Sequence, residues 1–268
     1  MLKIVSLRFN QYVRRNSTSL PFLSGDGFNL ISQETSLPVF FIKSELLENS
    51  LLNLSDRTED FVLIAGNSDR DFLINMPKMP RNLRRLYLQN SFISDGDLIR
   101  TLPIGVENLR HSTNGLPRTL RAGIGFSEKR NQILLGPFGA THSERAQILD
   151  LGTHKDLVVS TQRVSPNEYS KYASTFRFVA CPRGNGVDTH RVWETLYRGS
   201  IPIVIDNAWS RSLEYLNLPI IRIPAWTKNH LLETLEKSAE LIPELPQNLE
   251  YLWINAWEKL FRQDLAEP

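Results

Sequence analysis

The sequence predicts an α/β protein with two regions, each built on a mostly parallel sheet. Short apolar runs rich in strand-forming residues alternate with segments of helical periodicity in both halves of the chain. Hydrophobic residues make up 41% of the 268 residues, which is enough to form a core and argues against a disordered protein. We therefore expect a first domain at residues 1–125, a second at 126–245, and a C-terminal helix at 246–268 that packs back across the domains.

The first region is expected to consist mainly of short strands. Two glycines make 24–27 read as a turn-rich loop, and several glycines and prolines make 110–130 read as a linker or mobile loop between the regions. A short helix is predicted at 44–54, and a short apolar piece lies at 102–105. Strands are predicted at residues 2–9, 38–42, 61–65 and 83–88.

The second region shows a regular alternation of strands and helices. Strands are predicted at residues 132–135, 157–159, 178–181, 201–205 and 220–223. Thr141-His142-Ser143-Glu144 has the pattern of a capping box, and Ser165-Pro166-Asn167-Glu168 begins a second helix with proline in its first turn. Further helices are predicted at 190–198, 209–216, 229–241 and 249–262, with Pro243 and Pro246 breaking the chain between the last two.

Residues 176–205 have the pattern of one strand–helix–strand unit, and its loop carries most of the polar chemistry of the chain. Asp188 or Thr189 can cap the helix, and Gly199 suits the left-handed residue that ends it. In open α/β sheets, ligands bind at the carboxyl ends of the strands, where this loop is expected. The loop has the sequence Pro182-Arg183-Gly184-Asn185-Gly186-Val187-Asp188-Thr189.

The residue types of this loop suit an anion, above all a phosphate. Arg183 can bind phosphate oxygens in a bidentate way, and Gly184 and Gly186 permit positive φ and a close approach of the backbone. His190 and Arg191 place positive charge at a helix N-terminus, where it is most favourable beside a bound anion. One turn later, Glu194 is placed to bind paired hydroxyls such as those of a ribose. The combination predicts a site for a nucleoside diphosphate.

Purely structural roles can also explain these residue types. The glycines can simply form a tight turn, and Arg191 with Glu194 can be a surface ion pair. His190 and Glu194 have the spacing of two metal ligands, but no third ligand is evident, so no metal is predicted. The loop is neither a Walker A motif nor the G-x-G-x-x-G dinucleotide motif. Cys181 is expected to be a small buried residue, because no base partner for a nucleophile can be named.

Composition excludes several other classes of protein. A net charge of +2 gives no basic tail for nucleic acid, so no nucleic-acid partner is expected. A single cysteine excludes an internal disulfide framework and fits a reducing compartment. The chain has no apolar run of about 18 residues, and its first residues read as a strand, not a signal peptide. We expect a cytoplasmic protein that can contact a membrane surface peripherally through a lipid-linked substrate.

The central segment resembles the exostosin-like glycosyltransferases, that is, family 47 and its bacterial relatives. A weaker likeness, to the acceptor-side half of similar bacterial enzymes, covers 67–69, Gln89-Asn90 and 102–108. The stronger likeness is dense over about 40 residues. It consists of Phe178-Val179, Pro182-Arg183-Gly184-Asn185-Gly186, Asp188-Thr189-His190-Arg191, Trp193-Glu194, Leu196, Gly199 and Ile201-Pro202-Ile203-Val204.

The resemblance implies a GT-B fold, with two Rossmann-like domains facing across a cleft. It also implies metal-independent transfer, usually with inversion, of a hexosyl or pentosyl group from a nucleoside-diphosphate sugar to a hydroxyl of a glycan or lipid-linked acceptor, as in polysaccharide biosynthesis. The second domain would bind the donor, with Arg183 and residues 184–191 facing the diphosphate and Glu194 holding the ribose. The nucleotide-sugar is a substrate, and no cofactor is implied.

An inverting transfer needs a base, which we expect from the first domain. Asp69 is the first choice because it follows a confident strand, with Asp26 and Glu107 as weaker candidates and helix capping as the alternative role for Asp69. His190 is expected to help stabilise the departing diphosphate. Two other functions stay open: a non-catalytic module that binds nucleotide-sugars, and a different phosphate-handling transferase.

Overall fold

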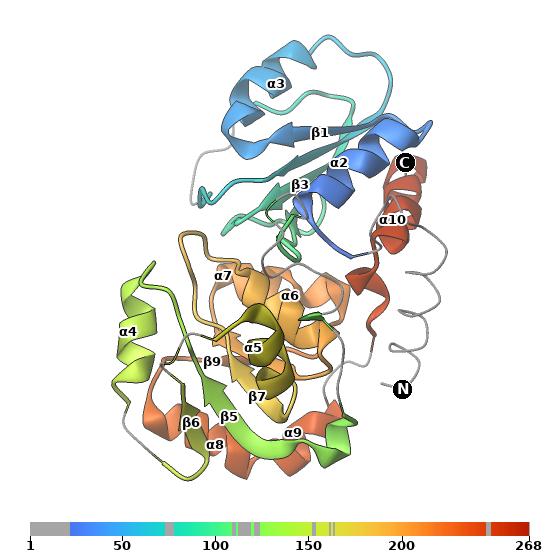
Figure 1. Cartoon of the computed structure of the whole chain (residues 1–268). Helices are drawn as coiled ribbons and strands as arrows, with labels where there is room; N and C mark the ends of the chain where they lie inside the picture. Colours follow the sequence, from blue (N-terminus) through green and yellow to red (C-terminus); the bar gives the residue numbers. More distant parts are fainter. Residues whose placement is uncertain are drawn as a thin grey trace.

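The computed structural model describes residues 22–72, 78–108, 111, 119–120, 124–151, 154–160, 162, 164–244 and 248–267. Within them the chain forms two sheets, and every strand pair is parallel (Figure 1). The first sheet has the order β1-β2-β3-β4 and the second the order β6-β5-β7-β8-β9. This confirms the predicted α/β class with mostly parallel sheets.

The strands lie close to their predicted positions. The first sheet contains β1 (Val39–Lys43), β2 (Phe61–Gly66), β3 (Leu83–Gln89) and β4 (Ile99–Leu102). The second contains β5 (Arg130–Leu135), β6 (Leu157–Val159), β7 (Phe176–Ala180), β8 (Ile201–Ile205) and β9 (Ile221–Ile223). β4 begins earlier than the apolar piece recognised at 102–105, and the strand predicted at 2–9 lies outside the described residues.

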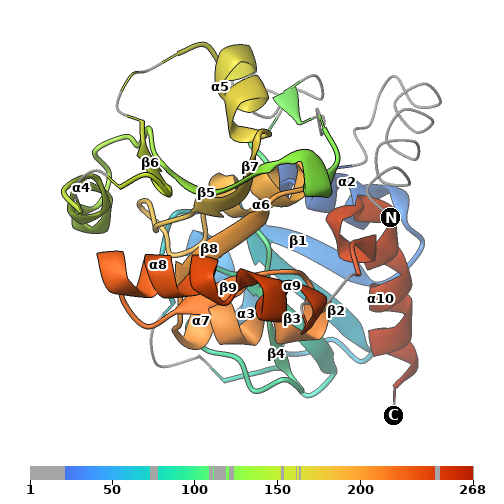
Figure 2. The ribbon, with the colours of Figure 1, turned by 90° about the horizontal axis from the view of Figure 1, so that it is seen from below.

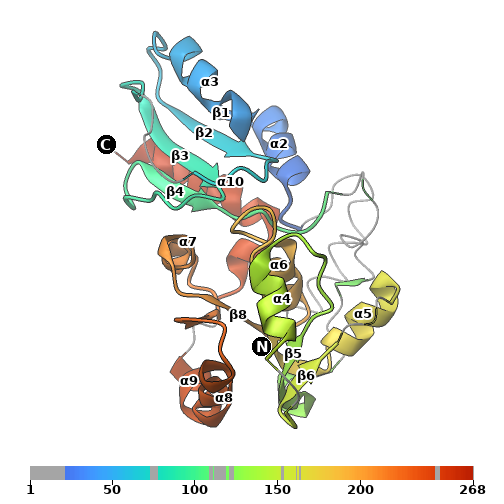
Figure 3. The same ribbon diagram turned by 90° about the vertical axis from the view of Figure 1, so that its left-hand side faces the viewer.

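Helices cover both faces of the first sheet, and the alternation of its side chains shows which helix covers which face. Val62 and Ile64 of β2 belong to the same apolar cluster as Phe28 of α2 (Gly25–Glu34) and Trp257 of α10 (Ile254–Ala266). The intervening residues of β2, Phe61 and Leu63, pack instead with residues of α3 (Leu47–Asn53). Successive strand residues point to opposite faces, so α2 and α10 share one face and α3 lies on the other (Figure 3).

The second sheet is covered in the same way. Leu134 and Val179 pack with α6 (His190–Tyr197). Ile133 and Phe178, one residue earlier in each strand, pack with α8 (Lys228–Glu236) and α4 (Ser143–Leu149). Figure 2 shows α8 and α9 in front of β8 and β9. The remaining helical elements are η1 (Ser44–Leu46), η4 (Phe126–Glu128), α5 (Pro166–Ala173), α7 (Ala208–Ser212), η5 (Glu214–Leu216), α9 (Ser238–Glu244) and η6 (Glu250–Leu252).

The predicted loop at 24–27 is wrong, because it forms the start of α2. Ser24 is the N-cap, and its Oγ accepts a hydrogen bond from the N–H of Gly27 at 3.1 Å. A side chain at Gly25 would place its Cβ 1.6 Å from Oδ1 of Asn67, so this glycine permits close packing and does not mark a turn. The glycine pair, taken as a sign of a turn, belongs to the first turn of a helix.

Two other helix boundaries differ from those predicted. The first helix of the second region begins at Ser143 with His142 as N-cap, so Thr141 is not the cap. Pro243 lies inside α9, which follows α8 as a separate helix; the predicted helix at 229–241 is thus two helices. Pro246 lies outside the described residues. The capping box of Ser165 and Glu168 is confirmed at the start of α5.

The chain returns to the first sheet at its end. α10 follows the second sheet in sequence but contacts α2, β2 and β3 (Figure 1). One apolar cluster also joins residues of both sheets, including Tyr87, Val179 and Trp257. The domain boundaries proposed from the sequence stay predictions. No helix of the described part is long and apolar enough to cross a membrane.

Candidate functional site

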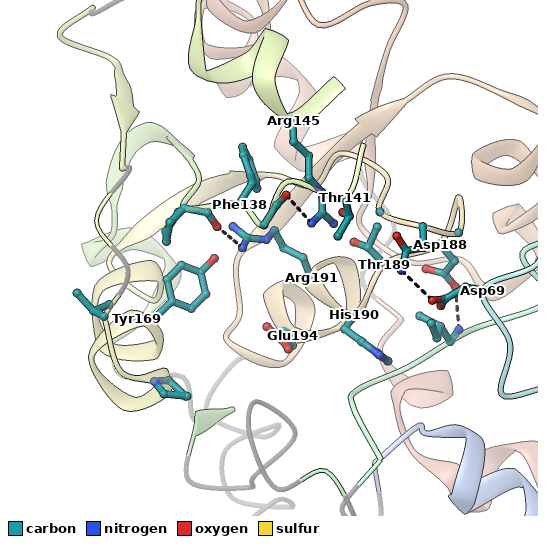
Figure 4. Close-up of a pocket in the computed structure, with 18 residues that line it drawn as sticks. Asp69, Phe138, Thr141, Arg145, Tyr169, Asp188, Thr189, His190, Arg191 and Glu194 are labelled. Carbon is teal, nitrogen blue, oxygen red and sulfur yellow. Dashed lines mark hydrogen bonds between the residues drawn. The ribbon is translucent and has the colours of Figure 1, made fainter. Parts of the chain in front are cut away.

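A cavity of about 650 Å³ lies at the carboxyl ends of strands from both sheets (Figure 4). The first sheet contributes Asp69, which follows β2, and Ile104, which follows β4. The segments after β5, β6 and β7 contribute the rest of the lining. This is the edge at which parallel α/β sheets bind ligands. The lining from the second region consists of Pro137, Phe138, Gly139, Thr141, Arg145, Val164, Pro166, Tyr169, Gly184, Asn185, Gly186, Asp188, Thr189, His190, Arg191 and Glu194.

The central strand–helix–strand unit presents the N-terminus of α6 to this cavity. β7 ends at Ala180, the polar loop follows, and α6 begins at His190 after the N-cap Thr189. Gly199 takes the left-handed conformation with φ of 67° and ends the helix as predicted. The first N–H groups of a helix have no partner within the helix, so this end of α6 favours a negative ligand.

Arg191 is held firmly on the cavity wall. Its guanidinium lies 4.8 Å from the ring centroid of Phe138 and 5.1 Å from that of Tyr169. Its Nη2 donates a hydrogen bond to the carbonyl of Pro137 at 2.7 Å. The aromatic rings restrict the side chain and stabilise its charge through cation–π contact. Its position is thus set before any ligand binds.

A second guanidinium reaches the cavity from α4. Arg145 donates from Nε to the carbonyl of Arg183 at 2.8 Å and from Nη1 to that of Gly139 at 3.3 Å. Burial, and then the charge of Arg191, lower the pKa of Arg145. Among the described residues, neither Arg145 nor Arg191 forms an ion pair with a carboxylate.

Three polar side-chain atoms of the lining are buried without a hydrogen-bond partner among the residues described. They are Oη of Tyr169, Oγ1 of Thr189 and Nη1 of Arg191. Thr189 is only 7% exposed, and its side chain does not cap α6. Buried polar atoms normally have partners, so a cluster of unsatisfied ones indicates where a ligand would supply them.

Glu194 lies on the same helix, one turn inside the cavity. It is 6% exposed, and its Oε2 accepts a hydrogen bond from Arg198 at 3.2 Å. The ion pair therefore joins Glu194 to Arg198, not to Arg191 as the surface-pair alternative required. Its Oε1 makes no hydrogen bond to the described residues, which leaves an acceptor for a ligand hydroxyl.

His190 joins the first turn of α6 to the first region. Its Nδ1 lies 2.8 Å from the carbonyl oxygen of Gly105. The ring lies on the side of the cavity toward the segment after β4 (Figure 4).

Asp69 lies opposite, in the loop after β2. It is exposed, and its Oδ2 accepts a hydrogen bond from Nδ2 of Asn185 at 3.1 Å. Around it, Gln89 accepts from the N–H of Asn67, and Asn90 donates to the carbonyl of Ser68. The loop is thus held in place by polar residues at the carboxyl end of β3.

Asp188 lines the cavity, but its hydrogen bonds are structural. It is 3% exposed; its Oδ2 accepts from the N–H of Ile104 at 2.7 Å and its Oδ1 from the indole of Trp193 at 2.8 Å. Its own N–H donates to Oδ1 of Asn90 at 2.9 Å. Burial raises the pKa of Asp188 to about 7. This carboxyl connects the two regions.

Arg183 lies outside the cavity lining, unlike the position expected from the sequence. Its Nη2 forms an ion pair with Asp71 and donates to the carbonyl of Asn185 at 3.0 Å. Asp71 also accepts from the N–H of Val187 at 2.9 Å. Arg183 therefore contacts the first region. Arg145 lines the cavity, where the sequence had led us to expect Arg183.

Gly184 and Gly186 do not use the positive φ that glycine permits. A Cβ on Gly186 would lie 2.6 Å from the side chain of Asn90, and one on Gly184 would lie 2.9 Å from Nη2 of Arg145. Gly186 therefore permits the close approach of Asn90, and Gly184 lies directly beside the Arg145 guanidinium. The N–H of Gly184 donates to the carbonyl of Gly186, so it does not face a ligand.

The other sequence candidates lie elsewhere. Asp26 and Glu107 are not among the lining residues. Cys181 is buried, as predicted, and burial raises the pKa of its thiol to about 12. No cluster of three metal-ligating side chains occurs in the described part of the chain. The assignments to donor binding and catalysis stay predictions.

Arg145, Phe138 and Tyr169 were missed by sequence reasoning. Phe138 and Arg145 lie 44 and 37 residues before Pro182, and Tyr169 lies 13 residues before it. The parallel pairing of β5 with β6 and β7 brings their segments beside the central loop. The one available signal was that all of them follow the carboxyl end of a predicted strand of the same sheet.

Comparison of the chain with protein-family models and with curated proteins finds no match. The geometry and charge of the cavity are therefore the basis for a function.

Proposed function

We propose that the protein is a glycosyltransferase of the GT-B type, which moves a sugar from a nucleoside-diphosphate donor to a hydroxyl of a glycan or lipid-linked acceptor. The donor would occupy the cavity at the carboxyl ends of the two sheets. This agrees with what the resemblance of the central segment implies. The proposal rests on one observation above all, the pair of guanidiniums without carboxylate partners.

The pair of Arg145 and Arg191 is unfavourable in the free protein. Two like charges repel, and partial burial removes part of their hydration. Burial and the charge of Arg191 lower the pKa of Arg145 for this reason. A diphosphate would neutralise both charges, and the α6 N-terminus and Oγ1 of Thr189 would add hydrogen bonds to its oxygens.

The rest of the cavity suits the remaining parts of a nucleotide. Phe138 and Tyr169 form an aromatic wall on the side of Arg191 away from His190 (Figure 4), and the apolar Val164 and Pro166 also line the cavity. This wall can hold a nucleobase, and the free oxygen of Glu194 can accept a hydrogen bond from a ribose hydroxyl.

The same groups can assist bond breaking. Negative charge develops on the diphosphate as it leaves the anomeric carbon, and fixed guanidiniums with a helix N-terminus stabilise that charge. Their positions are already set by carbonyl and aromatic contacts, so little reorganisation is needed. We infer that this charge stabilisation makes the transfer independent of a metal ion.

The first prediction concerns the guanidinium pair. The ligand is UDP or GDP, whichever binds the native protein. Arg191→Met and Arg145→Met should each weaken its binding by about 10- to 100-fold, because each removes a charge-assisted contact worth about 1.5–3 kcal/mol. Isothermal titration calorimetry measures the affinities, and thermal melting checks that each variant is folded.

Arg177→Met is the matched control. Arg177 is an arginine of β7 that stacks on Phe126, away from the cavity. Its removal should leave the nucleotide affinity unchanged. Equal affinities for the native protein and both cavity variants, or no binding of any nucleoside diphosphate, would contradict the proposed function.

A further inference from the structure

We propose that His190 is the general base of the transfer, with Nε2 accepting the proton of the acceptor hydroxyl. This inference rests on the proposed function and adds a catalytic group to it. Asp69 was the base expected from the sequence. The structure favours His190 through the tautomer that Gly105 imposes on its ring.

The hydrogen bond to Gly105 determines which nitrogen carries the proton. A carbonyl oxygen can only accept, so Nδ1 of His190, 2.8 Å away, must be the donor. In the neutral ring Nε2 is then an acceptor with a free lone pair. Nε2 makes no hydrogen bond to any described residue, and His190 lines the cavity.

Gly105 is itself fixed, so the ring has a defined orientation. The glycine has φ of 68°, and a Cβ there would lie 2.2 Å from the carbonyl oxygen of Leu23. It pairs with Ser24 in an isolated β-bridge, and the N–H of Val106 donates to Leu23 at 2.7 Å. A rigid carbonyl behind Nδ1 is the arrangement that orients a catalytic imidazole.

No described carboxylate forms an ion pair with the His190 ring. Arg191 is its neighbour in the first turn of α6 and in the cavity lining. The acidic groups of the lining are engaged elsewhere: Asp188 with Ile104 and Trp193, Glu194 with Arg198. Asp69 is exposed and bonded to Asn185.

In the proposed step, Nε2 takes the proton of the acceptor hydroxyl and becomes N–H in an imidazolium. The oxygen forms a bond to the anomeric carbon while the bond from that carbon to the diphosphate oxygen breaks, and its electron pair leaves with the diphosphate. The imidazolium then returns its proton to water. No oxidant or reductant is involved.

The tautomer can be measured without a substrate. Long-range ¹H–¹⁵N spectra of protein labelled at histidine distinguish Nδ1–H from Nε2–H rings, and comparison with His190→Gln assigns the signals. We expect the Nδ1–H form for His190. A ring protonated on Nε2 alone would overturn the proposal.

The catalytic role is tested by separating turnover from binding. The sugar nucleotide that stabilises the native protein most, among UDP-glucose, UDP-N-acetylglucosamine, UDP-glucuronate and GDP-mannose, is the donor, with water and p-nitrophenyl glycosides as acceptors. His190→Ala and His190→Gln should lower turnover at least about 100-fold and leave the donor affinity within a factor of about three. Added imidazole should restore part of the turnover of His190→Ala.

Two variants serve as comparisons. His154→Ala removes a histidine at the edge of β6, outside the cavity, and should turn over donor at the native rate. Asp69→Asn tests the base that the sequence suggested.

Each outcome decides between the two proposals. Full turnover in both His190 variants, or turnover lost in Asp69→Asn and kept in His190→Ala, would overturn the role of His190 while the proposed function stands. Donor binding without turnover in the native protein would favour the non-catalytic module and overturn both proposals. Loss of donor affinity with His190→Gln would make His190 a phosphate ligand and would also overturn the base role. Failure of every nucleotide to bind would overturn the proposed function instead.

Discussion

The chemistry of single residues depends on which region each side chain binds. Asp188 appears in the sequence as one more polar residue of the loop, yet its carboxyl accepts from Ile104 of the first region and from Trp193 of its own helix. Arg183 likewise extends to Asp71 of the first region. Arg191, Thr189 and Arg145 line the cavity instead, and Thr189 and Arg191 each have a buried polar atom without a partner among the described residues.

Asp188 leads to a pH prediction. Burial raises its pKa to about 7 from 3.8, so the folded protein keeps this proton over a range in which the unfolded chain loses it. The stability that Asp188 contributes is therefore complete below the unfolded pKa and is lost as the pH rises through the folded one. Relative to Asp188→Asn, the native free energy of unfolding should fall from about pH 4 to pH 7, with a slope of up to about 1.4 kcal/mol per pH unit.

Urea denaturation at each pH measures the two curves. The substitution also turns an amide N–H₂ toward one of the two donors, but that cost does not vary with pH. Parallel curves for the native protein and Asp188→Asn would contradict the raised pKa.

At the scale of elements, caps and apolar alternation explain where most helices and strands begin. The capping box of Ser165 with Glu168 and the left-handed Gly199 could be predicted from the sequence, because local preferences agree there with the tertiary structure. α2 was missed because its first turn contains Gly25 and Gly27. A glycine in a helix lowers the helix propensity, and here packing against Asn67 outweighs that cost.

The N-cap of α2 can be tested directly. Ser24→Ala removes the acceptor of the Gly27 N–H and should lower the free energy of unfolding by about 1 kcal/mol. Gln33→Ala, an exposed change in the same helix, should stay within about 0.5 kcal/mol of the native value. Chemical denaturation of both variants checks this, and equal stability of Ser24→Ala and the native protein would remove Ser24 as the cap.

For the whole molecule, α10 joins the end of the chain to the first sheet. Asp264 of α10 is 1% exposed and accepts hydrogen bonds from Arg85 at 3.1 Å and Arg100 at 3.0 Å, as well as from the hydroxyl of Tyr87. These partners lie on β3 and β4, more than 160 residues earlier. The packing of α10 therefore stabilises the sheet that presents Asp69 and Ile104 to the cavity.

Asp264→Ala should cost about 3–5 kcal/mol of unfolding free energy, because it leaves Arg85 buried without its main partner. Glu258→Ala breaks the exposed pair with Arg262 on the same helix and should cost less than about 1 kcal/mol. Urea unfolding followed by tryptophan fluorescence compares the two, since Trp257 packs in the core beside them. A cost for Asp264→Ala no larger than that for Glu258→Ala would refute the role of this network.

Local sequence determined the class of fold, most strand positions and the helix N-terminus that faces the cavity. These features depend on residues close together in the chain, on apolar alternation, caps and glycine stops. Only the tertiary structure decided which polar side chains reach the site. The order of strands in a sheet is not encoded in any short segment, so the meeting of Arg145 from α4 with Arg191 from α6, and of His190 with the carbonyl of Gly105, follows from long-range pairing of parallel strands. That pairing turned Arg183 toward the first region and left Arg145 and Arg191 in the cavity.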